Sequence, residues 1–102
     1  MHGFRELAAR RVSVRGYTSE PVDDRMLDEV LEAGRLAPSA ANRQPWHIVV
    51  VRDEAVRRAL HRAYPRDWFL QAPVVLVVCT EPAAAWRRSD GKNYADVDGA
   101  IL

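Results

Sequence analysis

Two arginines and a serine alternate with valines near the start of the chain, in the segment Arg11-Val12-Ser13-Val14-Arg15. In an extended backbone, side chains two positions apart point to the same side, so Arg11, Ser13 and Arg15 would share one face. A guanidinium group binds two phosphate oxygens at once through its planar fork and stays charged at any relevant pH. The segment therefore predicts a receptor for a dianion such as phosphate. The same spacing is also typical of a solvated edge strand with two surface arginines, and spacing alone does not choose between them.

A second candidate segment runs from Ala37 to Trp46 and contains two prolines, Pro38 and Pro45. Proline lacks a backbone donor and holds φ near about −65°, so neither residue suits a helix interior or a central strand. The segment is therefore predicted to be a loop. Because proline favours extended backbone at the residue before it, Gln44 is expected to be extended.

This loop carries the hydroxyl group of Ser39 and the carboxamide groups of Asn42 and Gln44, close to Trp46. Hydroxyl and carboxamide groups both donate and accept hydrogen bonds. A stiff loop that presents them beside an apolar surface can pair with the edge of a flat heteroaromatic ring. The loop is therefore a candidate binding site for such a ring.

These two segments together resemble the nitroreductase family of FMN-dependent oxidoreductases. The resemblance rests on Arg11-x-Ser13-Val14-Arg15-x-Tyr17 and on Ala37-Pro38-Ser39-x-x-Asn42-x-Gln44-Pro45-Trp46, and it continues through residues 72–78 and 94–100. Either motif alone would be weak, but their order and separation are specific together.

The resemblance implies a set of cofactor-binding residues. Arg11, Ser13 and Arg15 fall where the family holds the phosphate and ribityl chain of FMN. Pro38, as a stiffener, Ser39 and Asn42 fall where it meets the isoalloxazine, and Gln44 is a weaker candidate for the same region. Val12 departs from the family, which often has a second polar residue there, so only its backbone is expected to contribute.

The resemblance also implies a reaction. A reduced nicotinamide, NAD(P)H, would give hydride to FMN and leave, and a nitroaromatic, a quinone or a similar acceptor would then be reduced in a ping-pong cycle. The cofactor carries this chemistry, so no catalytic side chain is predicted, and His2, His47 and His61 lie in three separate elements. Reductive dehalogenation and oxidation of a carbon–nitrogen bond remain open, as does the choice between NADH and NADPH.

The fold implied is α+β, a nitroreductase-like three-layer α/β/α sandwich with a mixed, mostly antiparallel sheet. Family members are about twice as long, so residues 1–102 are expected to form one partial FMN-binding domain with its second half absent. In the family, two subunits form a homodimer with the flavin at their interface. The alternative is an inactive fragment, or a non-catalytic module that binds flavin or dimerises.

The composition of the chain indicates which kinds of partner and which cell compartment to expect. Fifteen Lys and Arg residues balance fourteen Asp and Glu residues without a basic cluster, so no nucleic-acid partner is predicted. The apolar run from Ala72 to Cys79 is far shorter than the roughly 20 residues of a membrane helix. The charged start of the chain does not predict a secretory leader. One cysteine allows no internal disulfide and favours the cytoplasm, and no metal site is predicted.

Hydrophobic periodicity and capping residues predict the regular elements. Helices are expected over residues 4–10, 24–36 and 54–63, around 83–88, and from near Asn93 onward, with buried strands over 47–51 and 74–79. The second helix is expected to be capped by Asp23 or Asp24, and the third by Asp53. The second helix should bury Met26, Leu27, Val30 and Leu31. The third should turn Val56, Ala59 and Leu60 inward and Arg57, Arg58 and Arg62 outward. Cys79 is expected to be a small buried packing residue.

Overall fold

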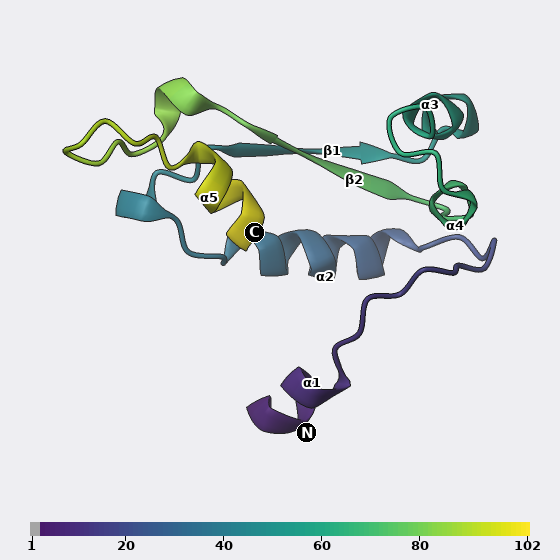
Figure 1. Ribbon diagram of the computed structural model, residues 1–102. Coiled ribbons are helices and arrows are strands. Elements are labelled where there is room, and N and C mark those ends of the chain that lie inside the picture. Colours follow the sequence, from purple (N-terminus) through teal and green to yellow (C-terminus); the bar gives the residue numbers. More distant parts are fainter. Residues whose placement is uncertain (1–2) are drawn as a thin grey trace.

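The computed structural model describes residues 3–102, so the expectation about His2 lies outside the part that can be compared. The elements follow one another as α1 (Phe4–Arg10), α2 (Asp24–Arg35), η1 (Ala40–Asn42), β1 (Trp46–Val51), α3 (Glu54–Leu60), α4 (Asp67–Leu70), β2 (Val75–Thr80), η2 (Pro82–Ala84) and α5 (Ala95–Ile101). Within residues 3–102, no helix combines the length and the apolar character needed to cross a membrane. Figure 1 shows how these helices and strands are arranged.

The sheet consists of β1 and β2, which pair antiparallel from Trp46 opposite Thr80 to Val51 opposite Val75. The connection between them is not a tight turn, because it carries α3 and α4, which lie together at one end of the sheet (Figure 1). Helices and an antiparallel sheet are thus combined in an α+β fold, as predicted.

Helices α2 and α5 lie on the same face of the sheet (Figure 1). A Cβ added at Gly34 of α2 would lie 3.3 Å from Leu102 Cδ1 and 3.8 Å from Ile48 Cδ1, so α2 approaches both β1 and the end of α5 closely. The opposite face is uncovered at Val49, which is 50% exposed, whereas Val51 on the same face, next to α3, is buried. Two of the three predicted layers are therefore present.

Aspartate caps start the two helices for which the sequence predicted them. The side chain of Asp23 accepts a hydrogen bond from the Met26 amide, and that of Asp53 accepts one from the Val56 amide. Each cap satisfies an amide that has no partner within the helix. These starts are confirmed.

The predicted buried faces of α2 and α3 are only partly correct. Leu27 is buried, but Met26 and Val30 are 58% and 54% exposed, because no element within residues 3–102 packs over that side of α2. Val56 of α3 is exposed, whereas Arg57 turns inward and donates to the carbonyl oxygen of Ala72 at 2.7 Å. The prediction that Arg57 would face solvent is wrong.

Three further expectations differ from the structure. Cys79 is exposed, because it lies on the sheet face that the described helices leave open. The helix expected over residues 83–88 is absent, and the short turn η2 is followed by an isolated bridge between Arg87 and Asn93. The short helix α4 was not predicted from the sequence.

Candidate functional site

The first candidate group lies on residues 11–17, which follow α1 outside any helix or strand and which we call the arginine arm. The arm has no strand partner, and Arg11, Ser13 and Arg15 are all exposed. None of the ion pairs formed within residues 3–102 involves either arginine. The backbone is extended at Arg11, with φ −64° and ψ 129°, and the arm belongs to no helix or strand.

Tyr17 attaches the end of the arginine arm to the rest of the chain. Its backbone amide donates to Gln71 Oε1 at 3.3 Å, and its ring lies 6.2 Å from that of Trp68, between centroids. Its hydroxyl group donates back to the carbonyl oxygen of Val14 at 3.1 Å, inside the arm itself. The arm is thus held at one end and leaves its arginines free to bind.

The second candidate group lies on residues 38–45, which we call the proline turn. Ala41, Asn42 and Gln44 have φ values of 53°, 52° and 50°, in the left-handed region that L residues other than glycine rarely adopt. Gln44 was expected to be extended, and that expectation is wrong. Its amide donates to Ser39 Oγ at 2.9 Å, a bond that the folded turn makes across five residues.

Both ends of the proline turn are attached to other elements. The Ala40 amide donates to Asp98 Oδ1 of α5 at 3.0 Å. At the other end, the Glu81 amide beyond β2 donates to the carbonyl oxygen of Pro45 at 2.8 Å, and the Pro45 side chain is fully buried. The turn is therefore a fixed feature that lies against α5 and the end of β2.

The proline turn presents the polar groups that the sequence singled out. Ser39 is half-buried, while Asn42 and Gln44 are exposed. The Ser39 oxygen accepts from the Gln44 amide, which leaves its own hydrogen available as a donor. Pro38, Ser39 and Asn42 are thus brought together on one short, ordered segment.

The structure does not bring the arginine arm and the proline turn together within one chain. The arm precedes the N-terminal end of α2 and the turn follows its C-terminal end (Figure 1). A helix of 12 residues is about 18 Å long. Across the described part of the chain, no hydrogen bond joins the two segments.

Asp98 is a residue of this region for which sequence reasoning assigned no role. It is 2% exposed, and its Oδ2 is buried without a hydrogen-bond partner among the described residues. The sequence feature that could have pointed to Asp98 is the presence of a carboxylate inside the apolar pattern of the last helix, between Val97 and Ala100. Periodicity places such a residue on a buried face, but only the fold shows that it meets the Ala40 amide.

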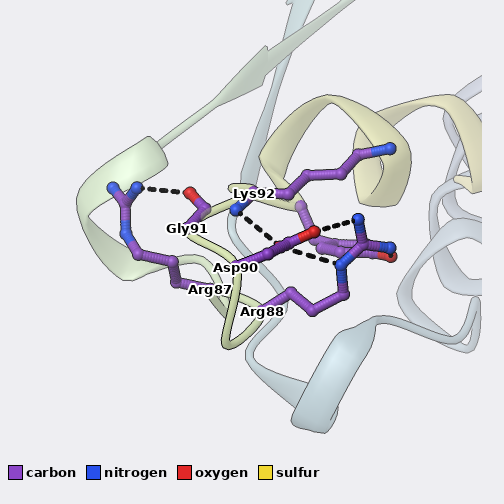
Figure 2. A network of polar contacts seen from close by, with 6 residues as sticks. Arg87, Arg88, Asp90, Gly91 and Lys92 are labelled. Atoms are coloured by element: carbon purple, nitrogen blue, oxygen red, sulfur yellow. Dashed lines mark hydrogen bonds and ion pairs between the residues drawn. The ribbon is translucent and has the colours of Figure 1, made fainter.

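A hairpin of polar contacts leads into α5 (Figure 2). Arg88 Nε and Nη2 donate to the two carboxylate oxygens of Asp90 at 2.9 and 2.5 Å, and Arg87 donates to the Gly91 carbonyl oxygen at 2.8 Å. The hydrogen bonds from Arg88 lower the pKa of Asp90 below its usual range, and the Lys92 amide adds to this effect. The hairpin ends at Tyr94, whose carbonyl oxygen accepts from the Asp98 amide at 2.9 Å.

Metal-ligating side chains do not gather anywhere in residues 3–102: no three His, Cys, Asp or Glu side chains form a group that could hold an ion. The polar groups of the arginine arm and the proline turn are instead guanidinium, hydroxyl and carboxamide groups. Such groups bind organic phosphates and heterocyclic rings.

Comparison with characterised sequences identifies relatives over most of the chain. An NADH dehydrogenase from Thermus thermophilus is 44% identical over 93 residues, which cover 90% of this chain and 45% of the relative. The FMN reductase [NAD(P)H] of Bacillus subtilis is 37% identical over 70 residues, which cover 68% of this chain and 28% of the relative. The chain therefore spans less than half the length of these relatives.

A solved structure and a family model give the same assignment. The crystal structure of a nitroreductase family protein from Clostridium difficile 630 matches with a TM-score of 0.82 and 32% identity, over 98% of this chain and 57% of that one. The sequence model described as the nitroreductase family matches residues 8–64, which include the arginine arm and the proline turn. Since that match covers more than half of the 102 residues, the protein belongs to the nitroreductase family.

Proposed function

We propose that this protein is an FMN-dependent oxidoreductase that passes electrons from NAD(P)H to a nitroaromatic, a quinone or a similar small acceptor. Membership of the family supports this proposal, as do relatives named FMN reductase and oxygen-insensitive NADPH nitroreductase. In this proposal residues 1–102 contribute one FMN-binding domain.

The observation that carries the proposal is the state of the two arginines on the arm. Of the described arginines, Arg25, Arg35, Arg52, Arg58 and Arg88 pair with carboxylates, whereas Arg43, Arg62 and Arg66 are exposed without an ion pair. The arm differs from these in carrying two such arginines with a serine between them at alternate positions. Arg11 and Arg15 form no ion pair within residues 3–102 and are exposed. Two unneutralised guanidinium groups on one short segment fit a phosphate dianion, so we assign them and Ser13 to the phosphate and ribityl oxygens of FMN.

The proline turn is assigned to the isoalloxazine. Ser39 and Asn42 offer hydroxyl and carboxamide groups for its heteroatoms, and Gln44 lies beside them. Pro38 stiffens the start of the turn. Because both ends of the turn are attached to other elements, the binding groups are pre-organised and lose little freedom when the ring binds.

Bound FMN would supply the redox chemistry, by accepting a hydride equivalent from NAD(P)H and then releasing electrons to the acceptor after NAD(P)⁺ has left. The residues of this chain would bind and orient the cofactor. No acid, base or nucleophile is assigned to a side chain.

The separation of the arm from the turn supports a site built by two copies of the chain. We propose a homodimer in which each flavin lies at the subunit interface, between the arginine arm of one subunit and the proline turn of the other. We place the protein in the cytoplasm, where its single cysteine would stay reduced.

Titration with FMN tests the proposal directly. The purified protein should take up FMN, with a shift in the visible absorption of the flavin, and NADH or NADPH added without oxygen should bleach that absorption. A nitroaromatic or a quinone should then restore it. A protein that takes up no FMN would contradict the proposal, and one that binds FMN without reduction would be a non-catalytic flavin-binding module.

A further inference from the structure

Asp98 is the one charged side chain that is buried among the described residues. It lies on α5, and its Oδ1 accepts the Ala40 amide, 58 positions away in the sequence, at 3.0 Å. A buried carboxylate is costly unless hydrogen bonds or charges compensate it. The bond to the proline turn is the compensating contact of this side chain in the structure, which points to the turn as the reason for its position.

The proline turn is a segment that needs to be held in place. Three of its residues, Ala41, Asn42 and Gln44, have positive φ without being glycine. Such backbone strain persists only where the surrounding structure determines it, and it collects at binding sites. The hydrogen bond within the turn, from the Gln44 amide to Ser39, does not connect the turn to another element. Asp98 holds the start of the turn, where the strained residues begin.

We propose that Asp98 is the positioning residue of the proline turn. Its Oδ1 fixes the Ala40 amide, and this fixes the left-handed residues that follow and the direction in which Ser39 and Asn42 present their polar groups. Asp98 does not itself belong to the binding surface, because it is buried beneath the turn. The consequence for FMN binding rests on the function proposed above, whereas the effect on the turn does not.

The use of a single oxygen by Asp98 predicts which substitutions are tolerated. Only Oδ1 bonds to the turn, since Oδ2 is buried without a partner in the described part of the chain. Asparagine keeps one acceptor oxygen in the same place, so Asp98→Asn should preserve the turn. Leucine has a similar size but no acceptor, so Asp98→Leu should release it. Asp96 is an exposed aspartate of the same helix, which makes Asp96→Asn the matched control.

Amide hydrogen exchange, measured residue by residue on the full chain without FMN, tests the effect on the turn. In Asp98→Leu, the amides of Ala40 and Gln44 should exchange faster by about tenfold or more, as expected when a buried donor loses its partner. The amides that pair β1 with β2 should keep their protection. Asp98→Asn and Asp96→Asn should match the wild type to within about threefold. Unchanged exchange at Gln44 in Asp98→Leu would overturn the proposal.

FMN affinity tests the consequence for the site. Asp98→Leu should weaken FMN binding by roughly tenfold or more, while Asp98→Asn recovers most of the wild-type affinity. An Asp98→Leu protein that is folded and binds FMN as tightly as the wild type would show that Asp98 has only a structural role. If the wild type binds no FMN, the proposed function fails, and the exchange pattern still decides whether Asp98 positions the turn.

Ala40→Pro provides a second route if Asp98→Leu does not fold. Ala40 is the first residue of η1, and Ser39 before it is extended, with φ −143° and ψ 156°, which is the backbone that proline favours at the preceding residue. Proline at position 40 therefore removes the amide donor. The amide of Gln44 should then lose protection although Asp98 is intact. Wild-type protection at Gln44 would overturn the proposal.

Discussion

At the scale of single residues, the candidate site is defined by groups that lack partners. Arg11 and Arg15 are exposed guanidinium groups without an ion pair in residues 3–102, and Asp98 has one buried oxygen without a donor. Exposed surface pairs such as Arg58 with Glu54 contribute little to stability. We therefore expect FMN binding to depend on Arg11 and Arg15, and not on arginines such as Arg58 that already pair with a carboxylate.

Substituting the arm arginines should weaken FMN binding through the phosphate group alone. Arg11→Gln and Arg15→Gln should each raise the dissociation constant of FMN by roughly ten- to a hundredfold, the scale of a hydrogen bond to a charged group. Riboflavin, which has no phosphate, should bind the variants and the wild type alike. Fluorescence titration with both ligands measures this, and Arg58→Gln on α3 is the matched control. Equal losses for FMN and riboflavin would contradict a phosphate-binding role.

The sequence predicted the loop that carries the candidate residues Pro38, Ser39 and Asn42, but not the backbone angles of that loop. The prolines correctly predicted a loop, and the hydroxyl and carboxamide groups do lie together on it. Gln44 does not follow the preference of a residue before proline: its φ is 50°, and its amide donates to Ser39 Oγ across the folded turn. Asp98 could not be assigned a role, since the contact with Ala40 joins residues 58 positions apart.

At the scale of elements, local signals predicted where helices begin, and long-range packing decided which faces they bury. Asp23 and Asp53 are caps whose partners lie three residues away, so the sequence alone predicted Asp53 and limited the other cap to Asp23 or Asp24. Val56 faces solvent and Arg57 faces inward, opposite to the prediction, because Arg57 donates to the carbonyl oxygen of Ala72 in a later segment of the chain. Strand positions were predicted well, whereas their burial was not, since it depends on layers outside the strands.

The contact between α5 and β2 depends on the absence of a side chain at Gly99. A Cβ there would lie 2.6 Å from Thr80 Cγ2, closer than two carbon atoms can approach. Gly99→Ala should therefore reduce the free energy of unfolding by about 1–3 kcal/mol, measured by urea denaturation. In a Thr80→Ser background, which lacks that methyl group, most of the loss should disappear.

Gly16→Ala is the control for this experiment, because nothing lies within 4 Å of a Cβ at that position. It should leave stability unchanged or slightly raised, since alanine restricts the unfolded chain more than glycine does. A Gly99→Ala protein as stable as the wild type would show that α5 can move away from β2. That result would also argue against a fixed position of Asp98, because Asp98 lies on α5.

The hairpin before α5 should respond to acid. The hydrogen bonds from Arg88 lower the pKa of Asp90 in the folded protein. The stabilisation of the hairpin by Asp90 is therefore fully present above the pKa that Asp90 has in the unfolded chain. It should be lost as the pH falls through the folded value. Carboxyl NMR should show Asp90 titrating below the usual aspartate range, and Arg88→Gln should raise that midpoint. A midpoint unaffected by Arg88→Gln would contradict the pairing in Figure 2.

At the scale of the whole molecule, the chain exposes far more surface than a compact protein of its size. Its accessible surface is 8019 Å², against about 5,800 Å² for a compact monomer of this mass. The radius of gyration is 16.0 Å, against about 13 Å for a compact chain of this length. The excess of roughly 2,200 Å² exceeds the 800 Å² or so that each partner buries in a standard interface. A second subunit is one way to cover it.

Mixing two inactive variants should show whether one chain or two build each flavin site. One variant carries Arg11→Gln with Arg15→Gln, and the other carries Ser39→Ala with Asn42→Ala, so neither should bind FMN as a homodimer. If the arm of one subunit faces the turn of the other, each mixed dimer has one intact site. Random pairing then restores FMN binding at roughly a quarter of all sites, as two-fold symmetry requires.

Co-refolding the two variants in equal amounts and titrating with FMN measures this recovery, with each variant refolded alone as the control. Recovery near that fraction would establish a site shared between subunits. No recovery in mixtures shown to contain mixed dimers would place the arm and the turn of each site in one chain. The arm would then have to leave the position it has below α2 and move to the far end of that helix, because α2 separates the two segments in the structure (Figure 1).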